Sequence, residues 1–252
     1  MASDEHPLDY TYLIVNPNYD NDNNEGWLGS SAAHQSYANA EFYNTNFDMY
    51  QIINGLPNGT YKVAVKGYYR AGDHTAAYAA YASEDSTTNL NAYVYAESAG
   101  KLVSAPMQSI CVGLGEEALN GGTGESVIDN TYYIPNSMQT ASLYMENGRY
   151  AHENAVIIRV TDGALKFGLL KTEKINYDWT IFDSWTLTYY GEDSALEESG
   201  NPAIINEVAA EVVAVTYYTL NGVQTDTMSK GIYIVRIVLS DGTVNVQKVL
   251  NR

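Results

Sequence analysis

The sequence predicts an all-β protein in which a large jelly-roll β-sandwich is followed by a small, sandwich-like β domain. Stretches in which apolar and polar residues alternate recur along most of the chain, as expected of strands with one buried face. Turn dipeptides such as Asp162-Gly163 and Asn221-Gly222 separate several of these stretches. The chain also has 23 Tyr against 4 Phe, and tyrosine suits strands whose rings are half buried and half solvated. Many short strands with glycine-containing turns favour a sandwich or jelly roll.

Composition excludes several classes of function. With 252 residues, of which 45% are hydrophobic, the chain can build a packed core. Its net charge of -17 argues against nucleic acid and against docking to anionic lipid. No apolar run approaches the roughly 20 residues that span a membrane. Cys111 is the single cysteine, so no intrachain disulfide is expected. The first six residues lack the parts of a signal peptide, so we expect a chain from which any leader is absent.

The first half of the chain predicts three strands before its composition changes. The first strand is expected at 10–15 and ends at Asn16-Pro17. The next two are expected at 47–53 and 60–70, on either side of a turn that contains Pro57 and Gly59. These strands should supply much of the sandwich.

The middle of the chain is rich in Ala, Ser, Asn and Gly from 71 to 124. It predicts strands around 76–83 and 93–95 and a short helix near 105–111. A further helix is expected at 137–145, and strands at 154–161 and 164–170 should form a hairpin.

The stretch 178–191 is predicted to be the last strand of the large domain. Alternation places its large apolar residues on one core face, together with one carboxylate. These residues are Trp179, Ile181, Asp183, Trp185, Leu187 and Tyr189. A buried carboxylate needs a cation, an arginine or several hydrogen-bond donors. The alternative is a β-bulge that turns Asp183 toward solvent, and alternation does not decide between the two.

The sequence predicts three segments. Residues 8–191 form the large domain, and 192–206, with their acids and a Pro202, form a linker. Residues 207–252 form the small domain, with strands at 211–220, 231–239 and 243–250. About 45 residues make a marginal core, so we expect this domain to be stabilised by contacts with the large domain or with a partner.

Several motifs resemble known families. The stretch Asn16 to Asp20, the pair Gly26-Trp27 and the strand containing Phe182-Asp183 are similar to carbohydrate-binding modules with a galactose-binding-like jelly roll. Over roughly residues 8 to 191, further motifs look like exported modules of gut-bacterial glycan-utilisation proteins. These motifs lie at 47–51, 56–61, 67–70, 134–138 and 178–183.

The tail is similar to C-terminal sorting domains of the type IX secretion kind. Leu220-Asn-Gly222 and Lys230-Gly-Ile-Tyr-Ile-Val235 carry this resemblance. It implies a secreted or cell-surface protein whose tail directs export and does not bind a ligand.

The resemblance to carbohydrate-binding modules also implies a structural calcium ion. In those modules an acid after the first strand and an aspartate in the last strand share the ion, and the matching residues here are Asp20 and Asp183. Calcium would supply the cation partner that a buried Asp183 needs.

Sugars present C–H faces to aromatic rings and hydroxyls to planar polar groups. The segment 67–74 and the start of the last strand offer that chemistry. The candidate ligand-binding residues are Tyr68, Tyr69, Arg70, Asp73, Asp178 and Trp179. The alternatives are that the rings fill the core and that Arg70 forms a salt bridge.

We therefore expect a non-catalytic, exported glycan-binding module of surface polysaccharide utilisation, with an oligo- or polysaccharide as its partner. The four histidines lack metal-binding spacing, and Glu116-Glu117 need not face a substrate together. The alternatives are a module that binds a protein at the cell surface, a structural module and, less favoured, a glycoside hydrolase.

Overall fold

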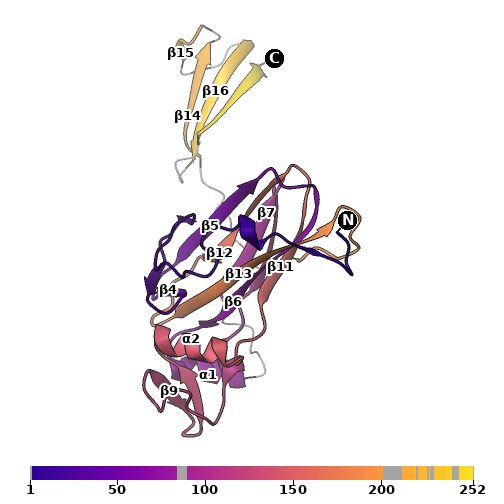
Figure 1. Cartoon of the computed structure of the whole chain (residues 1–252). Coiled ribbons are helices and arrows are strands. Elements are labelled where there is room, and N and C mark those ends of the chain that lie inside the picture. The colour runs from indigo at the N-terminus through magenta and orange to yellow at the C-terminus, as the bar shows by residue number, and fades with distance from the viewer. Residues whose placement is uncertain are drawn as a thin grey trace. The chain divides into compact units, whose positions relative to one another are not determined.

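The computed structural model describes residues 2–83, 90–200, 212–219, 221–225, 227, 230–239 and 244–251 (Figure 1). The chain divides into two compact units, Met1–Ala203 and Ile204–Arg252. Strands dominate both units, and the predicted all-β sandwich class is confirmed. None of the helices in the described part of the chain is long and apolar enough to cross a membrane.

The first unit is a β-sandwich of two antiparallel sheets. One sheet has the strand order β11-β6-β13-β4-β3, with β1 also paired to β13, and the other has the order β2-β5-β12-β7-β8. The first sheet consists of β1 Leu8–Asp9, β3 Ala33–Gln35, β4 Asn39–Tyr43, β6 Gly59–Arg70, β11 Asn154–Val160 and β13 Trp179–Gly191. The second consists of β2 Leu28–Gly29, β5 Phe47–Asn54, β7 Tyr93–Ser98, β8 Lys101–Pro106 and β12 Ala164–Lys171.

Apolar side chains of the two inner faces form the sandwich core. It contains Trp27, Val63, Phe167, Phe182 and Trp185, all buried. Alternation along β6 predicts one face with Tyr61, Val63 and Val65 and another with Lys62 and Lys66, and the first face is confirmed as the core face because its three residues belong to this core.

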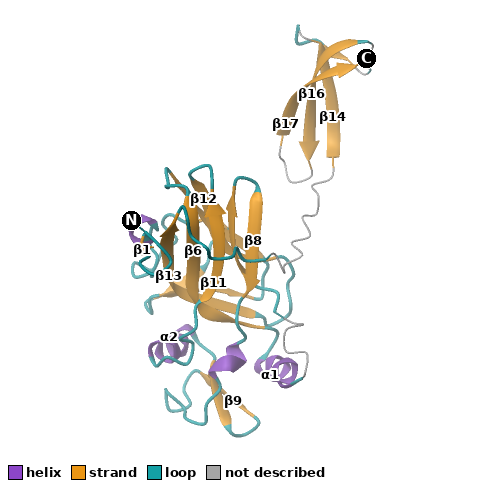
Figure 2. Ribbon diagram, turned by 90° about the vertical axis from the view of Figure 1, so that its right-hand side faces the viewer, coloured by secondary structure: helices purple, strands orange, loops and turns teal. Residues whose placement is uncertain are grey.

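A cap covers part of the outer face of the first sheet at one end of the sandwich (Figure 2). The cap consists of α1 His74–Ala82, η2 Ile110–Gly113, the hairpin β9 Glu125–Ile128 and β10 Tyr132–Pro135, and α2 Met138–Glu146. Its side chains form a second core with Tyr68, Trp179 and Ile181 of the sheet. The first sheet is therefore buried on both faces where the cap covers it.

A β-bulge divides β13 into two halves with opposite patterns. The pairing with β6 shifts between Asp183 and Thr186, and Ser184 has a left-handed φ of 54°. Before the bulge Trp179 and Ile181 face the cap core, whereas after it Trp185 and Leu187 face the sandwich core. The predicted single core face of this strand is therefore wrong.

Three other elements differ from prediction. The segment expected as a strand at 76–83 is the helix α1, whose first turn is capped by the carboxylate of Asp73 accepting a hydrogen bond from Ala76 N at 2.8 Å. The segment expected as a strand at 10–15 contains the 3-10 turn η1, Thr11–Leu13. The helix expected at 105–111 is replaced by the end of β8 and the 3-10 turn η2. Tyr78 and Tyr81 are three residues apart among alanines, a spacing and a composition that favour a helix over a strand.

The second unit contains an antiparallel sheet of order β15-β14-β16-β17. Its strands are β14 Val212–Thr219, β15 Gln224–Thr225, β16 Gly231–Leu239 and β17 Val244–Asn251. Tyr233 and Val235 of β16 are buried. The strands expected at 211–220, 231–239 and 243–250 correspond to β14, β16 and β17.

The first part of the predicted linker is hydrogen-bonded to the sandwich. Ser199 donates its N–H to the carbonyl of Ile157 at 2.9 Å, and Arg159 donates its N–H to Glu198 Oε1 at 2.8 Å. Residues 201–206 of that linker lie outside the described residues.

Candidate ligand-binding site

A row of three polar or aromatic side chains crosses the first sheet beside the cap. Trp179 on β13 lies directly opposite Tyr43 on β4 and opposite Arg70 on β6. Residues opposite each other in a sheet project from the same face, so these three side chains are neighbours. In the next row on this face, Glu41 lies opposite Ile181.

Trp179 is fixed by contacts on several sides. Its indole Nε1 donates a hydrogen bond to Glu41 Oε2 at 2.6 Å, and the guanidinium of Arg70 lies 5.2 Å from the ring centroid. The ring also meets Tyr68 edge to face at a centroid distance of 5.5 Å. Because only 3% of Trp179 is exposed, it forms a rigid wall rather than an open platform.

Each of the three guanidinium nitrogens of Arg70 donates a hydrogen bond. Nε donates to the carbonyl of Gly72 at 3.1 Å, NH1 to Asn136 Oδ1 at 2.7 Å and NH2 to the carbonyl of Tyr177 at 3.1 Å. These bonds tie β6 to the cap and to the loop before β13. The sequence-based alternative of a salt bridge is not what holds Arg70 here, since these three acceptors are neutral.

Glu41 is a partly buried acceptor beside Trp179 and Arg70. Burial raises the pKa of its carboxyl, while the hydrogen bond from Trp179 and the charge of Arg70 lower it. The net direction is upward, so this carboxyl is more easily protonated than an exposed glutamate.

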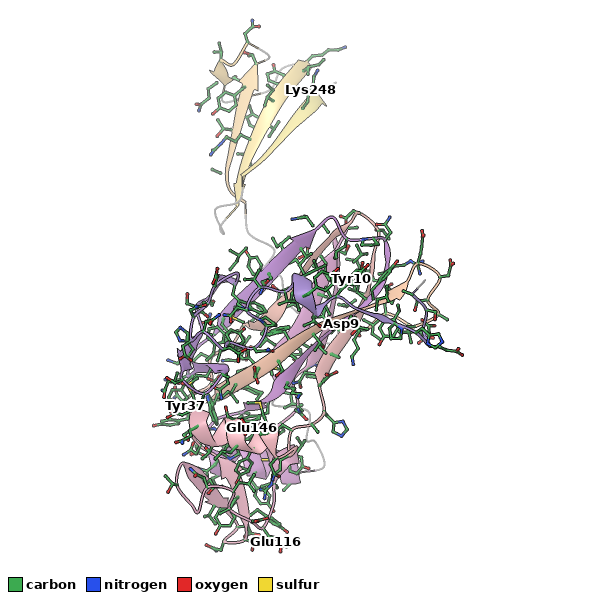
Figure 3. The ribbon with its side chains drawn as sticks, viewed as in Figure 1. Asp9, Tyr10, Tyr37, Glu116, Glu146 and Lys248 are labelled. Carbon is green, nitrogen blue, oxygen red and sulfur yellow. The ribbon has the colours of Figure 1, made fainter. Side chains whose placement is uncertain are left out.

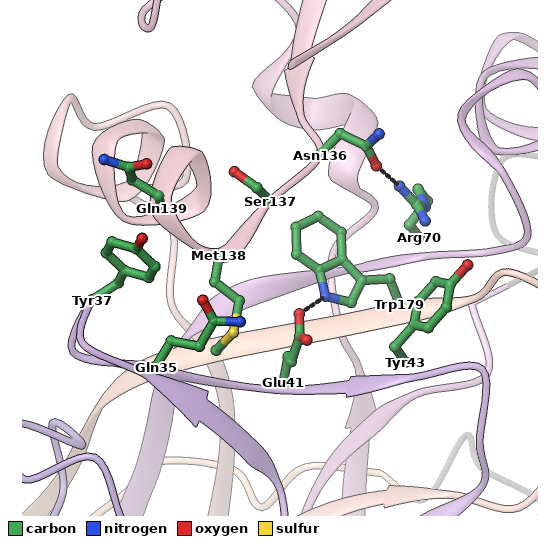
Figure 4. Close-up of a pocket in the computed structure, with 10 residues that line it drawn as sticks. All are labelled: Gln35, Tyr37, Glu41, Tyr43, Arg70, Asn136, Ser137, Met138, Gln139 and Trp179. Atoms are coloured by element: carbon green, nitrogen blue, oxygen red, sulfur yellow. Dashed lines mark hydrogen bonds between the residues drawn. The ribbon is translucent and has the colours of Figure 1, made fainter. Parts of the chain in front are cut away.

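These side chains line a hollow of about 400 Å³, which we call the site hollow (Figure 4). The β3–β4 region and the first turn of α2 provide its other walls. Its lining residues are Gln35, Tyr37, Glu41, Tyr43, Arg70, Asn136, Ser137, Met138, Gln139 and Trp179. Tyr43 is 51% exposed, so its ring is available to a ligand. The hollow therefore combines rings with amide, hydroxyl and carboxylate groups.

Hydrogen bonds place α2 against the β3–β4 region. Asn39 Nδ2 donates to the carbonyl of Met138 at 2.9 Å and to Ser142 Oγ at 3.0 Å, and Ser142 Oγ donates to the carbonyl of Tyr37. The helix starts with a capping box in which Ser137 and Thr140 exchange hydrogen bonds. The site hollow is thus bounded by rigid elements.

A buried ion pair supports the loop that leads into Trp179. Lys171 Nζ donates to Asp178 Oδ2, and both side chains are fully buried. Asp178 Oδ2 also accepts from Ile175 N at 2.9 Å, and the backbone carbonyl of Asp178 accepts from Asn44 N at 2.8 Å. Burial lowers the pKa of Lys171, and Asp178 opposes that shift.

The structure brings two of the six predicted ligand-binding residues into the site hollow, Arg70 and Trp179. The rings of Tyr68 and Tyr69 are fully buried: Tyr68 lies under the cap in the second core, and Tyr69 lies between the two sheets in the sandwich core. Neither ring is placed to stack on a ligand. Asp178 belongs to the buried ion pair and Asp73 caps α1, so these two carboxylates have structural roles in this fold.

Sequence reasoning missed the residues that complete the hollow. Tyr43 and Glu41 lie on β4, a strand that was not predicted, and Asn136 and Gln139 lie at the start of α2. The alternation in Asn39-Ala-Glu-Phe-Tyr43 is the signal that could have identified β4.

Asp20 and Asp183 lie near enough for their charges to interact. Burial raises the pKa of Asp183 to about 6, and the charge of Asp20 adds to this, while Ser184 and Lys66 oppose it. Ser184 donates its N–H to Asp183 Oδ1 at 2.6 Å and its Oγ–H to Oδ2 at 3.0 Å. The bulge alternative for Asp183 is therefore the one that the structure shows, with the side chain half buried. Within the described residues, no group of three or more His, Cys, Asp or Glu side chains could hold a metal ion.

The sequence matches no family model and no curated protein. Among solved structures, the chain is similar to TmCBM61 in complex with β-1,4-galactotriose, with 14% sequence identity and a TM-score of 0.38. The match covers 70% of this chain and 97% of that one. The case for a ligand in the present chain rests on its own hollow.

Proposed function

We propose that the first unit is a non-catalytic glycan-binding module and that the site hollow is its binding site. The observation that carries the proposal is the combination of an exposed Tyr43 ring with Glu41, Gln35, Asn136 and Gln139 in one rigid hollow. Aromatic rings stack on the C–H faces of sugars, and amide and carboxylate groups hydrogen-bond their hydroxyls. Tyr37 and Tyr43 line opposite parts of the hollow in Figure 4, with Gln35 and Glu41 between them.

The hollow is preorganised for binding. Trp179 and Arg70 are immobilised by hydrogen bonds to other parts of the protein, so they lose little freedom when a ligand enters. Trp179 and Arg70 form one wall of the hollow and fix the positions of Glu41 and Asn136. The free lone pairs of Glu41 and the amide group of Asn136 can then form hydrogen bonds with sugar hydroxyls.

A binding role suits this site better than hydrolysis. Glu41 is the carboxylate among the ten lining residues, whereas glycoside hydrolysis ordinarily uses two carboxyl groups that face each other. A protein-binding module is the second candidate, but the hollow is small and largely polar rather than a broad apolar patch.

We also propose that Asp20 and Asp183 share a structural calcium ion. Support comes from the charge interaction between the two carboxylates, which a cation would convert from repulsion to attraction. Further oxygen ligands would have to come from backbone, other side chains or water. Addition of 1 mM Ca²⁺ to chelator-treated protein should raise the Tm, and Asp20→Asn should abolish that rise. An unchanged Tm would contradict the calcium proposal.

Export to the cell surface and a role in polysaccharide utilisation complete the proposal. The resemblance of the tail to sorting domains supports export. Export can be tested by fractionating cells that express the full-length precursor with and without this tail and measuring how much of the protein reaches the cell surface. Retention inside the cell when the tail is removed is the expected result.

The test of glycan binding is an array of oligo- and polysaccharides probed with the purified chain. A selective hit should be lost in Tyr43→Ala and retained in Tyr12→Ala, a matched control because Tyr12 is 75% exposed and does not line the hollow. Circular dichroism would confirm that both variants fold. A hit that survives Tyr43→Ala would place the site elsewhere, and a blank array with folded protein would favour the protein-binding alternative.

A further inference from the structure

Two further hollows adjoin the site hollow along α2. One, of about 460 Å³, lies between α2, the loop that contains Asp20 and Asp22, and the β3–β4 turn. The other, of about 150 Å³, is lined by Lys66 and Asp183 together with residues of α2. Tyr37 lines all three hollows, and Glu146 lines both of the additional ones. We call these three adjoining hollows together the α2 groove; Figure 3 labels Tyr37 and Glu146, two of the residues that line it.

The α2 groove is acidic. Its carboxylates are Asp20, Asp22, Glu41, Glu146 and Asp183, and its cationic side chains are Arg70 and Lys66. Arg70 is already engaged, because its guanidinium donates to three protein oxygens. Lys66 lies directly opposite Asp183 in the sheet. In the lining of the three hollows the carboxylates therefore outnumber the cations five to two.

We infer that the α2 groove binds a run of several sugar residues of a neutral glycan and rejects chains that carry carboxylate or sulfate groups. This inference rests on the proposed glycan-binding function and deepens it by naming the ligand class. The five carboxylates can accept hydrogen bonds from sugar hydroxyls. The same carboxylates repel an anionic chain, and the repulsion acts over a distance set by the salt concentration.

The extent of the groove predicts a dependence on chain length. A single sugar can occupy one hollow, whereas a longer chain can reach from Tyr43 in the site hollow past Tyr37 to Glu146. Each further sugar that enters the groove adds contacts, so affinity should rise with length until the groove is filled.

The test is calorimetry with neutral and anionic oligosaccharides of equal length, in chelator at 20 mM and 150 mM NaCl. Neutral probes are tri- and hexasaccharides of galactan, xylan, β-glucan and mannan; anionic probes are the same lengths of polygalacturonate, alginate and chondroitin sulfate. We expect one neutral hexasaccharide to bind at least tenfold more tightly than every anionic one at 20 mM NaCl. We expect its affinity to exceed that of its trisaccharide at least fivefold.

Two variants test whether the carboxylates of the α2 groove are what weakens the binding of anionic oligosaccharides. Glu146→Gln removes a charge from the exposed end of the groove and should improve binding of anionic hexasaccharides at 20 mM NaCl at least twofold. Glu116→Gln makes the same change at an exposed acid that does not line the groove, and it should have no such effect (Figure 3).

Two results would overturn the inference while leaving glycan binding intact. They are an anionic chain that binds as tightly as the best neutral one, and equal affinities for the trisaccharide and the hexasaccharide. Absence of binding to all probes, with folded protein, would instead contradict the proposed function itself.

Discussion

Trp179 and Glu41 are joined by a 2.6 Å hydrogen bond that runs from the indole of β13 to a carboxylate on β4. The bond satisfies a buried indole N–H and holds the carboxylate beside the site hollow. One interaction therefore serves both the stability of the fold and the geometry of the proposed binding site.

Removal of the Glu41 carboxylate should destabilise the protein. In Glu41→Ala the Trp179 N–H loses its acceptor, and an unpaired buried donor costs about 1–3 kcal/mol. Glu41→Gln retains an oxygen that can accept the bond and should cost less. Urea unfolding followed by tryptophan fluorescence measures both values. Equal destabilisation by the two variants would show that the charge, rather than the hydrogen bond, is what matters.

The buried pair Lys171–Asp178 should show strong coupling. Lys171→Met leaves the Asp178 carboxylate buried without its cation, which costs about 3–5 kcal/mol. The double variant Lys171→Met/Asp178→Asn has no buried charge, and its amide oxygen can still accept the hydrogen bond from Ile175 N. It should therefore be more stable than Lys171→Met. Chemical denaturation of the variants in a double-mutant cycle tests this. Additive effects would contradict the coupling.

Asp183 predicts a specific dependence of stability on pH. Its pKa is about 6 in the folded protein and near 3.8 in an unfolded chain, so folding takes up a proton between these values. The contribution of this group therefore favours the fold at low pH and is lost as the pH rises through about 6. In chelator, Asp183→Asn should gain stability relative to wild type between pH 4.5 and pH 7. A constant difference across that range, measured by thermal unfolding, would rule out a raised pKa.

Gly67 should tolerate no side chain. It has a φ of 140°, and a Cβ there would lie 2.2 Å from the backbone oxygen of Ile181 on the neighbouring strand. Gly67→Ala should therefore destabilise by about 3 kcal/mol or more, as steric conflicts in a core do. Gly55→Ala is the matched control, because Gly55 also has a positive φ but nothing within 4 Å of the added Cβ. Similar melting temperatures for the two variants would refute the close approach.

The sequence predicts the class of the fold well, because alternation and turn dipeptides are local signals. The hairpin at Asp162-Gly163 and the core face of β6 are examples in which pattern and structure agree. Helix α1 is the case in which the predicted strand is wrong although the local signals favour a helix: Tyr78 and Tyr81 are three residues apart among alanines, and Asp73 acts as the N-cap rather than as a ligand group. Local patterns carry no information on which of two cores a residue enters.

The site is less predictable because it depends on the cap. Arg70 and Trp179 were identified from their chemistry, but Tyr68 and Tyr69 in the same segment are buried by contacts with residues distant in sequence, such as Tyr150 and those of the opposite sheet. Glu41 and Gln139 meet only because β4 and α2, about 100 residues apart, pack together. No pattern within a short stretch of sequence indicates that these two residues are neighbours in the fold.

The bulge at Ser184 also has a consequence for how the sequence can vary. In a regular strand a spacing of six residues would place Trp179 and Trp185 on the same face, so the extra residue of the bulge is what lets the two indoles enter opposite cores. A variant that lost the bulge but kept its length would turn one indole away from the core that it fills, whereas a variant that lost both the bulge and one residue would keep both indoles in place. Across natural variants, the spacing between these two tryptophans should therefore be even where the strand is bulged and odd where it is regular.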